Sequence, residues 1–368
     1  MSKKSIYIAA TSQHVGKTTM TLGLLAALKN QNINVGYSKP LGQQYLEVDG
    51  KRVDKDAVLF ADCMDFKLEP NTHSPVILGP GDTSDYIENP KTGVFVRKIL
   101  RAADVLRKSH EMVVYEGTGH PGVGSVVDLS NAEVAKQLES EVILVLEGGI
   151  GNTLDRLSLC KAVFDQAGVK IVGVLINKVH AKKMDKVRHY LEIALNKWNI
   201  ELLGIIPYDE VLVYPSMRHI VKAVKGTVLS GKEFLSNIVA DTIAGINMEF
   251  ATGDDPSKLL LVVSYRRLDE ALQNFENLCK ERNLPLHMAG ILVTGQGELT
   301  EAQIEHCVEL SIPVVQTPFD TYDSVIKMDH LVAKIDTQNK QKITRAIKLF
   351  REHVNIPRIV EIINAQGN

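Results

Sequence analysis

The chain has 368 residues, which is enough for two or three domains that each bury a core. With 45% hydrophobic and 23% charged residues it has the composition of an ordinary soluble protein, and its net charge of −2 gives no general attraction to nucleic acid or anionic membranes. No apolar run approaches the length of a membrane span, and the chain begins with a predicted strand instead of a signal-peptide core. Four dispersed cysteines lack metal-ligand spacing, as expected for reduced thiols in a cytoplasmic protein. They are Cys63, Cys160, Cys279 and Cys307.

The first predicted strand, residues 6–10, breaks into a short polar loop that ends in Gly16-Lys17-Thr18 and opens a helix. In such a strand–loop–helix unit, backbone N–H groups and the helix N-terminus bind a polyphosphate. Lys17 then reaches the β- and γ-phosphates, and the Thr18 hydroxyl ligates Mg²⁺. Thr11 stands at the first glycine position of the pattern G-x-x-x-x-G-K-[ST], and a helix start without a ligand is the alternative.

We therefore expect nucleotide contacts along this loop and the first turn of the helix. The candidate residues are Thr11, Ser12, Val15, Gly16, Lys17, Thr18 and Thr19.

Next along the chain, Lys39 lies at the carboxyl end of a second predicted strand, where ligands bind in open α/β sheets. The alternative is a solvated lysine before Pro40. A helix is predicted to begin over residues 53–58, with Asp54 and Asp56 near its start. These carboxylates either stabilise the helix dipole or supply one Mg²⁺ ligand.

A loop is predicted over residues 71–85 and a helix over 93–108. The apolar strand that follows, residues 112–116, ends in Glu116 and a glycine-rich turn that begins at Gly117. An acid at the end of a buried strand near a phosphate loop reaches Mg²⁺ directly or through water, and the alternative is a solvated strand terminus. Gly117 permits a close approach of the backbone to a ligand.

Strands and helices continue to alternate up to about residue 210. Strands are predicted over 142–147, 171–178 and 202–207, and helices over 154–167 and 183–198. This order indicates one doubly wound parallel sheet. Asn177 and Lys178 fall at the carboxyl end of a strand, where a side-chain amide can read an adenine edge, although asparagine is also common in turns.

A second, smaller α/β domain without a Gly–Lys phosphate loop follows. Little periodicity is visible over 211–231, and a turn is predicted over 252–256. The later elements are strands over 257–263, 287–293 and 313–316, helices over 268–282 and 300–311, and C-terminal helices over 341–353 and 357–363. The predicted domains are therefore 1–210, 211–335 and, for the C-terminal helices, 336–368.

These motifs resemble the P-loop group that contains dethiobiotin synthetase and cobyrinic acid a,c-diamide synthase. The matching segments are Thr11-Ser12, Val15-Gly16-Lys17-Thr18, Lys39-Pro40, Asp56-Ala57, Glu116-Gly117-Thr118-Gly119 and residues 173–178. The second domain resembles a DRTGG domain, with Ser264-Tyr265-Arg266-Arg267 in place of its Asp–Arg and Thr294-Gly295-Gln296 in place of its Thr–Gly–Gly. The whole chain is similar to the N-terminal two thirds of the long bacterial phosphotransacetylase.

The resemblance implies ATP and Mg²⁺ as ligands and assigns roles to single residues. Lys17 would be the phosphate lysine, and Lys39 would stabilise a transferring phosphoryl group or an anionic substrate. The metal ligands would be Thr18, Asp56 (or Asp54) and Glu116, and Asn177 would recognise the adenine.

Three functional hypotheses follow. The first is a nucleotide-responsive regulatory module, a homodimer by resemblance, with an enzyme of acetate metabolism as a possible partner. The second is an ATP-dependent ligase or ATPase that activates a small carboxylate as an acyl phosphate, with Lys17 and Lys39 as its catalytic residues. The third is an oligomerisation scaffold with a vestigial site.

Overall fold

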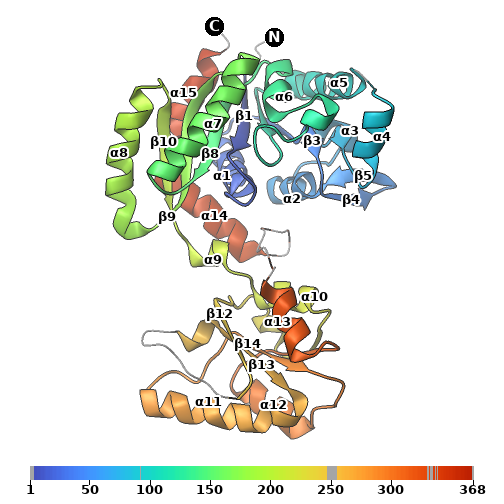
Figure 1. The fold of residues 1–368 in the computed structure, drawn as a ribbon, viewed down its shortest axis with the longest axis vertical. Coiled ribbons are helices and arrows are strands. Elements are labelled where there is room, and N and C mark those ends of the chain that lie inside the picture. The colour runs from blue at the N-terminus through green and yellow to red at the C-terminus, as the bar shows by residue number, and fades with distance from the viewer. Residues whose placement is uncertain are drawn as a thin grey trace. The chain divides into compact units, whose positions relative to one another are not determined.

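The computed structural model describes residues 4–91, 93–246, 255–329, 331, 335, 337 and 339–366. The chain forms two units, one of Met1–Tyr208 with Ile335–Asn368 and one of Asp209–Lys334, and Figure 1 shows the elements of each. None of the described helices combines the length and the apolar character that crossing a membrane requires.

A six-stranded, wholly parallel sheet forms the centre of the first unit. Its strands, in spatial order, are β10 (Glu201–Pro207), β9 (Ile171–Val179), β8 (Glu141–Glu147), β1 (Ser5–Ala10), β7 (Met112–Glu116) and β2 (Val35–Ser38). The central strands are apolar runs because both of their faces are covered by helices. The chain builds β2 and β7 on one side of β1 and β8 to β10 on the other, so the predicted doubly wound parallel sheet is confirmed.

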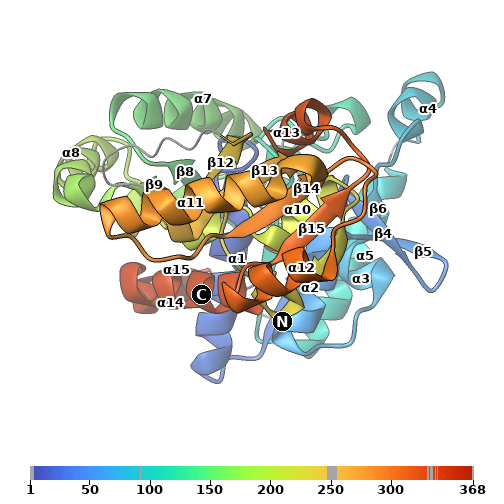
Figure 2. The same ribbon diagram turned by 90° about the horizontal axis from the view of Figure 1, so that it is seen from below.

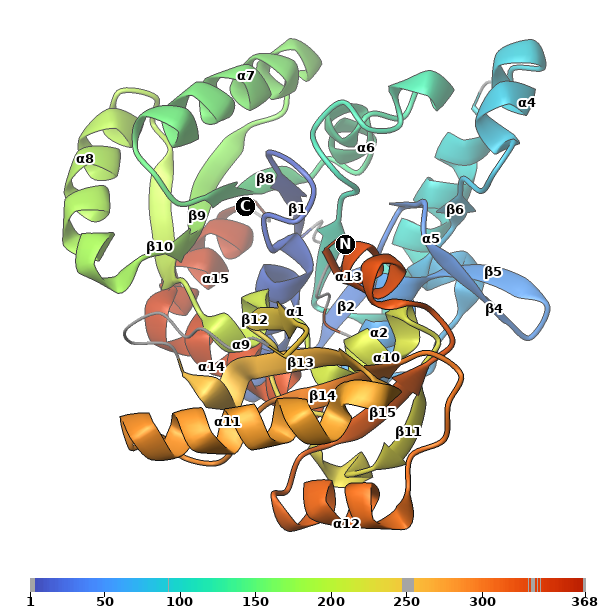
Figure 3. The same cartoon turned by 60° about the horizontal axis from the view of Figure 1, so that its bottom comes forward.

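Helices cover both faces of this sheet, and Figure 3 shows strands β8 to β10 between α7 and α8 on one side and α14 and α15 on the other. One hydrophobic core joins a face of the sheet to the helices on that side, four of which contribute several residues each. These are α5 (Val94–Ser109), α6 (Asn131–Gln137), α7 (Gly151–Ala167) and α8 (Met184–Asn196). On the other face lie α1 (Lys17–Asn30), α2 (Lys55–Met64), α14 (Lys340–His353) and α15 (Ile356–Ala365).

The C-terminal helices belong to the first unit instead of forming a separate part of the chain. At Gly23 of α1, a Cβ atom would lie 2.3 Å from the Phe350 ring of α14, so the two helices pack closely at this point. Gly204 of β10 forms a β-bridge with Val354. These contacts hold α14 and α15 against the first unit, although both helices follow the second unit in the sequence.

The second unit contains a five-stranded mixed sheet with a hydrophobic core on each face. The strand order is β11 (Thr227–Ser230), β15 (Val314–Thr317), β14 (Gly290–Thr294), β13 (Leu259–Ser264) and β12 (Asp241–Ala244), and only β11 is antiparallel to its neighbour. Its helices are α9 (Glu210–Val213), α10 (Met217–Ala223), α11 (Leu268–Arg282), α12 (Glu301–Glu309) and α13 (Thr321–Asp329). Figure 2 shows α11 along β13 and β14. Residues 252–254 of the predicted turn lie outside the described residues.

The region between β2 and α5 differs most from the sequence predictions. The predicted loop 71–85 is wrong, because short elements interrupt it: α3 (Pro70–His73), β6 (Val76–Ile77) and α4 (Asp82–Glu88). β3 (Leu41–Gly42) pairs with β6, and β4 (Tyr45–Val48) forms a hairpin with β5 (Lys51–Asp54). The hairpin turn has positive φ at Asp49 and Gly50, which is typical of a tight two-residue turn. Residues 51–54 therefore form a strand, and α2 begins at Lys55 instead of within the predicted start at 53–54.

Candidate functional site

The loop between β1 and α1 leaves the N-terminus of α1 without a side-chain cap. Gly16 is the N-cap, with a φ of 104°, and no acidic side chain lies in the first turn. A Cβ atom on Gly16 would lie 2.1 Å from Nδ2 of Asn177, so only glycine fits here. The first backbone N–H groups of a helix have no partner within the helix, and a helix start of this kind suits an anion.

Lys17, Thr18 and Glu116 meet directly beside this helix start. The Thr18 hydroxyl donates to Oε1 of Glu116 at 3.0 Å, and Lys17 Nζ lies 3.4 Å from the same oxygen. Glu116, at the carboxyl end of β7, is fully buried. Burial raises the pKa of Glu116 above its usual range, although the nearby Lys17 ammonium opposes the shift.

Tyr37 also binds Glu116, and the sequence analysis did not identify it. Its hydroxyl, which comes from the neighbouring strand β2, donates to Oε2 of Glu116 at 3.0 Å. Burial, together with the negative charge of Glu116, raises the pKa of Tyr37 well above its ordinary value, so the phenol stays protonated and remains a donor. Strand alternation could have shown that Tyr37 is buried, but not which carboxylate it faces across the sheet.

Lys39 lies between two carboxylates at the end of β2. Its Nζ is 3.0 Å from Oδ1 of Asp54 and also binds Oδ2 of Asp56. Burial lowers the pKa of Lys39, but Asp56, Asp54 and Glu116 together raise it above its usual value, so the ammonium is charged. Lys39 is buried, so the alternative of a solvated lysine before Pro40 is wrong.

Asp54 and Asp56 differ in their surroundings. Asp54 caps α2, because its Oδ1 accepts the backbone N–H of Asp56 at 2.9 Å. Its Oδ2 is buried and has no hydrogen-bond partner among the described residues. Burial raises the pKa of Asp54. The Asp56 side chain is 23% exposed, so it is the more accessible of the two carboxylates.

Asn177 and Lys178 both contact the loop from β9. Nδ2 of Asn177 donates to the carbonyl of Val15 at 2.7 Å, and Lys178 Nζ donates to the carbonyl of His14 at 2.8 Å. Lys178 also binds Oε1 of Glu147 at 2.9 Å. In this arrangement the two side chains fix the loop backbone, and the predicted adenine contact of Asn177 stays a prediction.

The other loop residues fall into three environments. The hydroxyl of Thr11 is buried and has no hydrogen-bond partner among the residues that the structure describes, while its backbone N–H donates to the carbonyl of Val145. Ser12 and Thr19 are partly exposed. Val15 is buried and fixes one end of the loop in the core.

The glycine turn after β7 is organised by Asn131, the first residue of α6, which the sequence analysis also missed. A Cβ atom on Gly117 would lie 2.5 Å from Oδ1 of Asn131, so the space that glycine leaves is used by this side chain. Oδ1 accepts the Tyr7 hydroxyl at 2.7 Å and the Thr118 N–H at 2.9 Å. Nδ2 donates to the carbonyls of Thr118 and His120. A ligand contact of Gly117 stays a prediction.

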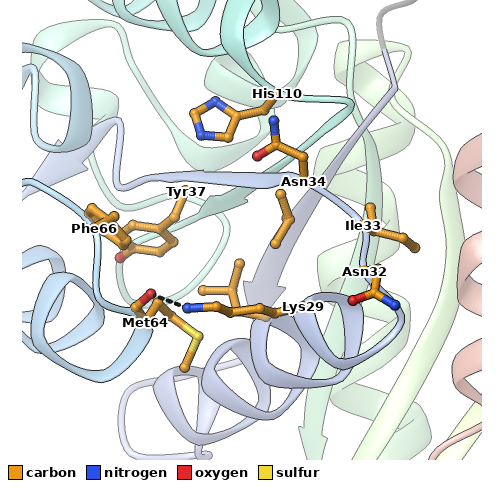
Figure 4. Close-up of a pocket in the computed structure, with 10 residues that line it drawn as sticks. Lys29, Asn32, Ile33, Asn34, Tyr37, Met64, Phe66 and His110 are labelled. Atoms are coloured by element: carbon orange, nitrogen blue, oxygen red, sulfur yellow. Dashed lines mark hydrogen bonds between the residues drawn. The ribbon is translucent and has the colours of Figure 1, made fainter.

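A hollow of about 450 Å³ lies at the other end of β2, away from the phosphate loop, and Figure 4 shows its lining. Lys29, Asn34, Phe66 and His110 contribute to it, and Lys29 donates to the carbonyl of Met64. Tyr37 also lines the hollow, although its hydroxyl is directed to Glu116.

Comparison with known proteins gives concordant results. A family model described as an AAA domain matches residues 4–216, more than half of the chain. The phosphate acetyltransferase of Nitratidesulfovibrio vulgaris is 24% identical over 373 residues, which cover 95% of this chain and 50% of that protein. The chain therefore spans about half the length of the curated relatives of this type. The ATP-dependent dethiobiotin synthetase of Nitrosopumilus maritimus is 26% identical over 226 residues, which cover 60% of this chain and 95% of that protein.

Among solved structures, the MinD cell division protein of Aquifex aeolicus aligns with a TM-score of 0.34 and 14% identity, and the alignment covers 56% of this chain and 84% of that one. The predicted resemblance to dethiobiotin synthetase and to part of phosphotransacetylase is confirmed by the sequence relatives. The DRTGG character of the second unit stays a prediction.

Proposed function

The chain belongs to an AAA domain family (AAA_26), and on that premise we propose that its first unit binds ATP with Mg²⁺ and acts as a nucleotide-responsive regulatory module. The phosphates would lie against the backbone N–H groups before α1, with Lys17 on the β- and γ-phosphates. Thr18, Glu116 and Asp56 would hold the metal ion together with phosphate oxygens. Bound Mg²⁺ neutralises phosphate charge and fixes the geometry of the triphosphate.

One observation carries this proposal: Lys17 and Thr18 at an uncapped helix start both contact the same buried carboxylate, Glu116. A buried carboxylate is costly unless a cation or several hydrogen bonds compensate it. A structural role alone does not require a lysine, a hydroxyl and an acid to meet at a free helix N-terminus. The buried hydroxyl of Thr11 and the buried Oδ2 of Asp54 have no hydrogen-bond partner within the described part of the chain, so a bound group or water could satisfy them.

A response to the nucleotide follows from the same contacts. With Lys17 on the phosphates, Glu116 would lose its present ion pair and would be available to help hold the metal ion, and Tyr37, which donates to Glu116 from β2, would link this change to β2. Lys39 at the end of β2 is in turn held by Asp54 and Asp56. The nucleotide state is thereby coupled to the packing of β2 and β7.

The experiment is calorimetric titration with Mg²⁺ and a non-hydrolysable ATP analogue. We expect tight binding that Lys17→Ala abolishes. Lys29→Ala, on the last turn of the same helix, is the matched control and should bind like the parent. If Lys17→Ala binds as tightly as Lys29→Ala, the proposal is wrong.

A second candidate is an ATP-dependent ligase or ATPase, with Lys39 on a transferring phosphoryl group. The buried, charged Lys39 at the carboxyl edge of the sheet favours it, because a fixed cation there would stabilise phosphoryl charge. The relative named as dethiobiotin synthetase gives the reaction class to test. Steady ADP release that a small carboxylate or diamine stimulates, and that Lys39→Met removes, would establish this candidate instead of the regulatory one.

Two finer expectations accompany the regulatory proposal. A homodimer is tested by light scattering with and without nucleotide. An enzyme of acetate metabolism as partner, an idea that rests on the relatives named phosphate acetyltransferase, is tested by co-purification with such an enzyme in the presence and absence of Mg²⁺ and ATP.

A further inference from the structure

The cations around the phosphate loop are not equivalent. Lys17 is paired with Glu116, Lys39 with Asp54 and Asp56, and Lys178 with Glu147. These carboxylates compensate the lysines before any ligand arrives. A polyphosphate brings several negative charges, so a lysine that turns to it must first give up its present partner.

Arg156, on α7, is the exception. Its Nη1 lies 3.4 Å from the hydroxyl of Ser12 in the loop, and its Nε donates to Oδ1 of Asn152 at 3.2 Å. Among the residues that the structure describes, no carboxylate lies within ion-pair distance of it. Its Nη2 has no hydrogen-bond partner in the same described part of the chain.

The position of Arg156 is fixed by its helix. Thr153, in the first turn of α7, donates its hydroxyl to the carbonyl of Glu147 and ties that turn to the end of β8. Strand β8 pairs with β1, which leads into the loop. Asn152 lies four residues before Arg156, one helical turn away, and holds the Nε edge of the guanidinium. The remaining edge is next to Ser12.

We propose that Arg156 is a phosphate-binding residue of the nucleotide site, which lays its guanidinium across the loop from α7. The inference rests on the proposed ATP binding and deepens it. A guanidinium offers two parallel N–H groups to phosphate oxygens, and this one can do so without leaving an uncompensated carboxylate behind. Unlike Lys17, Lys39 and Lys178, it brings to the loop a positive charge that no carboxylate of the described residues pairs with.

The test compares the affinity for a non-hydrolysable ATP analogue with Mg²⁺ across a set of variants. We expect Arg156→Ala to weaken binding about tenfold, the effect of one charge-assisted contact. Arg156→Gln keeps a hydrogen-bond donor for Ser12 but loses the charge, and it should lose as much affinity as the alanine variant. The affinity of the parent should also fall more steeply with salt than that of either variant.

Lys161→Ala, on the same helix, is the matched control, because Lys161 pairs with Asp165 and should leave the affinity unchanged. Thermal unfolding of all variants checks that α7 is intact, and the exposed position of Arg156 makes this the expected result. If Arg156→Gln binds like the parent, the residue only holds Ser12 and the inference fails. Parent-like binding of Arg156→Ala, while Lys17→Ala loses binding, overturns the inference but leaves the proposed function standing.

Discussion

The hydrogen bond from Tyr37 to Glu116 allows a quantitative test of the buried polar cluster. Tyr37→Phe removes the hydroxyl that lies 3.0 Å from Oε2 of Glu116 and leaves that oxygen buried without this donor. A hydrogen bond to a charged, buried group contributes about 2 kcal/mol. For a unit of this size we therefore expect the midpoint of thermal unfolding to fall by about 4–8 °C.

Tyr115→Phe is the matched control. Tyr115 is equally buried and lies next to Glu116 in β7, but its hydroxyl has no hydrogen-bond partner among the described residues. Arg107, which lies near that hydroxyl, donates to the carbonyl of Leu138. Removal of an unsatisfied hydroxyl should be neutral or slightly stabilising.

The assay uses Trp198, the one tryptophan of the chain, which packs against the core of the first unit. Its fluorescence reports the unfolding of that unit in urea or on heating. Because Tyr37 stabilises the ionised carboxylate, the difference between Tyr37→Phe and the parent should shrink as the pH falls through the raised pKa of Glu116. Equal stability of the parent and both variants at pH 7 would refute this reasoning.

Three further predictions concern residues around the site. Lys39→Met leaves Asp54 and Asp56 without their cation, so we expect the free energy of unfolding in urea to fall by about 3 kcal/mol at pH 7. The difference should become smaller at lower pH as the carboxyls protonate, and a loss below about 1 kcal/mol at pH 7 would contradict the buried ion pair. Burial lowers the pKa of His73 from 6.5 to about 4, so its contribution to stability is present above pH 6.5 and is lost as the pH falls through 4. His73→Asn should flatten the acid limb of the stability profile, and an unchanged profile would exclude His73 as its cause. Gly16→Ala should lose at least tenfold in nucleotide affinity, because its Cβ would lie 2.1 Å from Asn177, whereas Gly151→Ala has open space and should behave like the parent.

Much of the fold follows from sequence because the central strands are continuous apolar runs and each is followed by a helix. The loop at Gly16 and the acid at Glu116 could also be predicted as site residues, because each directly follows an apolar strand and ligands of parallel sheets bind at the carboxyl ends of the strands. The β4–β5 hairpin departs from the sequence prediction, which begins a helix at Val53 and Asp54, although Asp49-Gly50 is a strong hairpin signal.

Contacts across the sheet could not be predicted in this way. Tyr37 and Glu116 are 79 residues apart, and their contact depends on β2 lying next to β7 instead of β1. The two-sided pairing of Lys39 depends on the hairpin that returns Asp54 and Asp56 to the end of β2. Asn131 joins Tyr7 to the glycine turn only after α6 is packed, and an asparagine at a helix start gives no hint of this role.

The most direct measurement is a crystal structure of the protein with Mg²⁺ and a non-hydrolysable ATP analogue. The account predicts a triphosphate against the N–H groups that precede α1, Lys17 Nζ moved from Glu116 to the phosphates, and the metal ion between Thr18 and the carboxylates. A nucleotide bound elsewhere, with Lys17 still on Glu116, would contradict it.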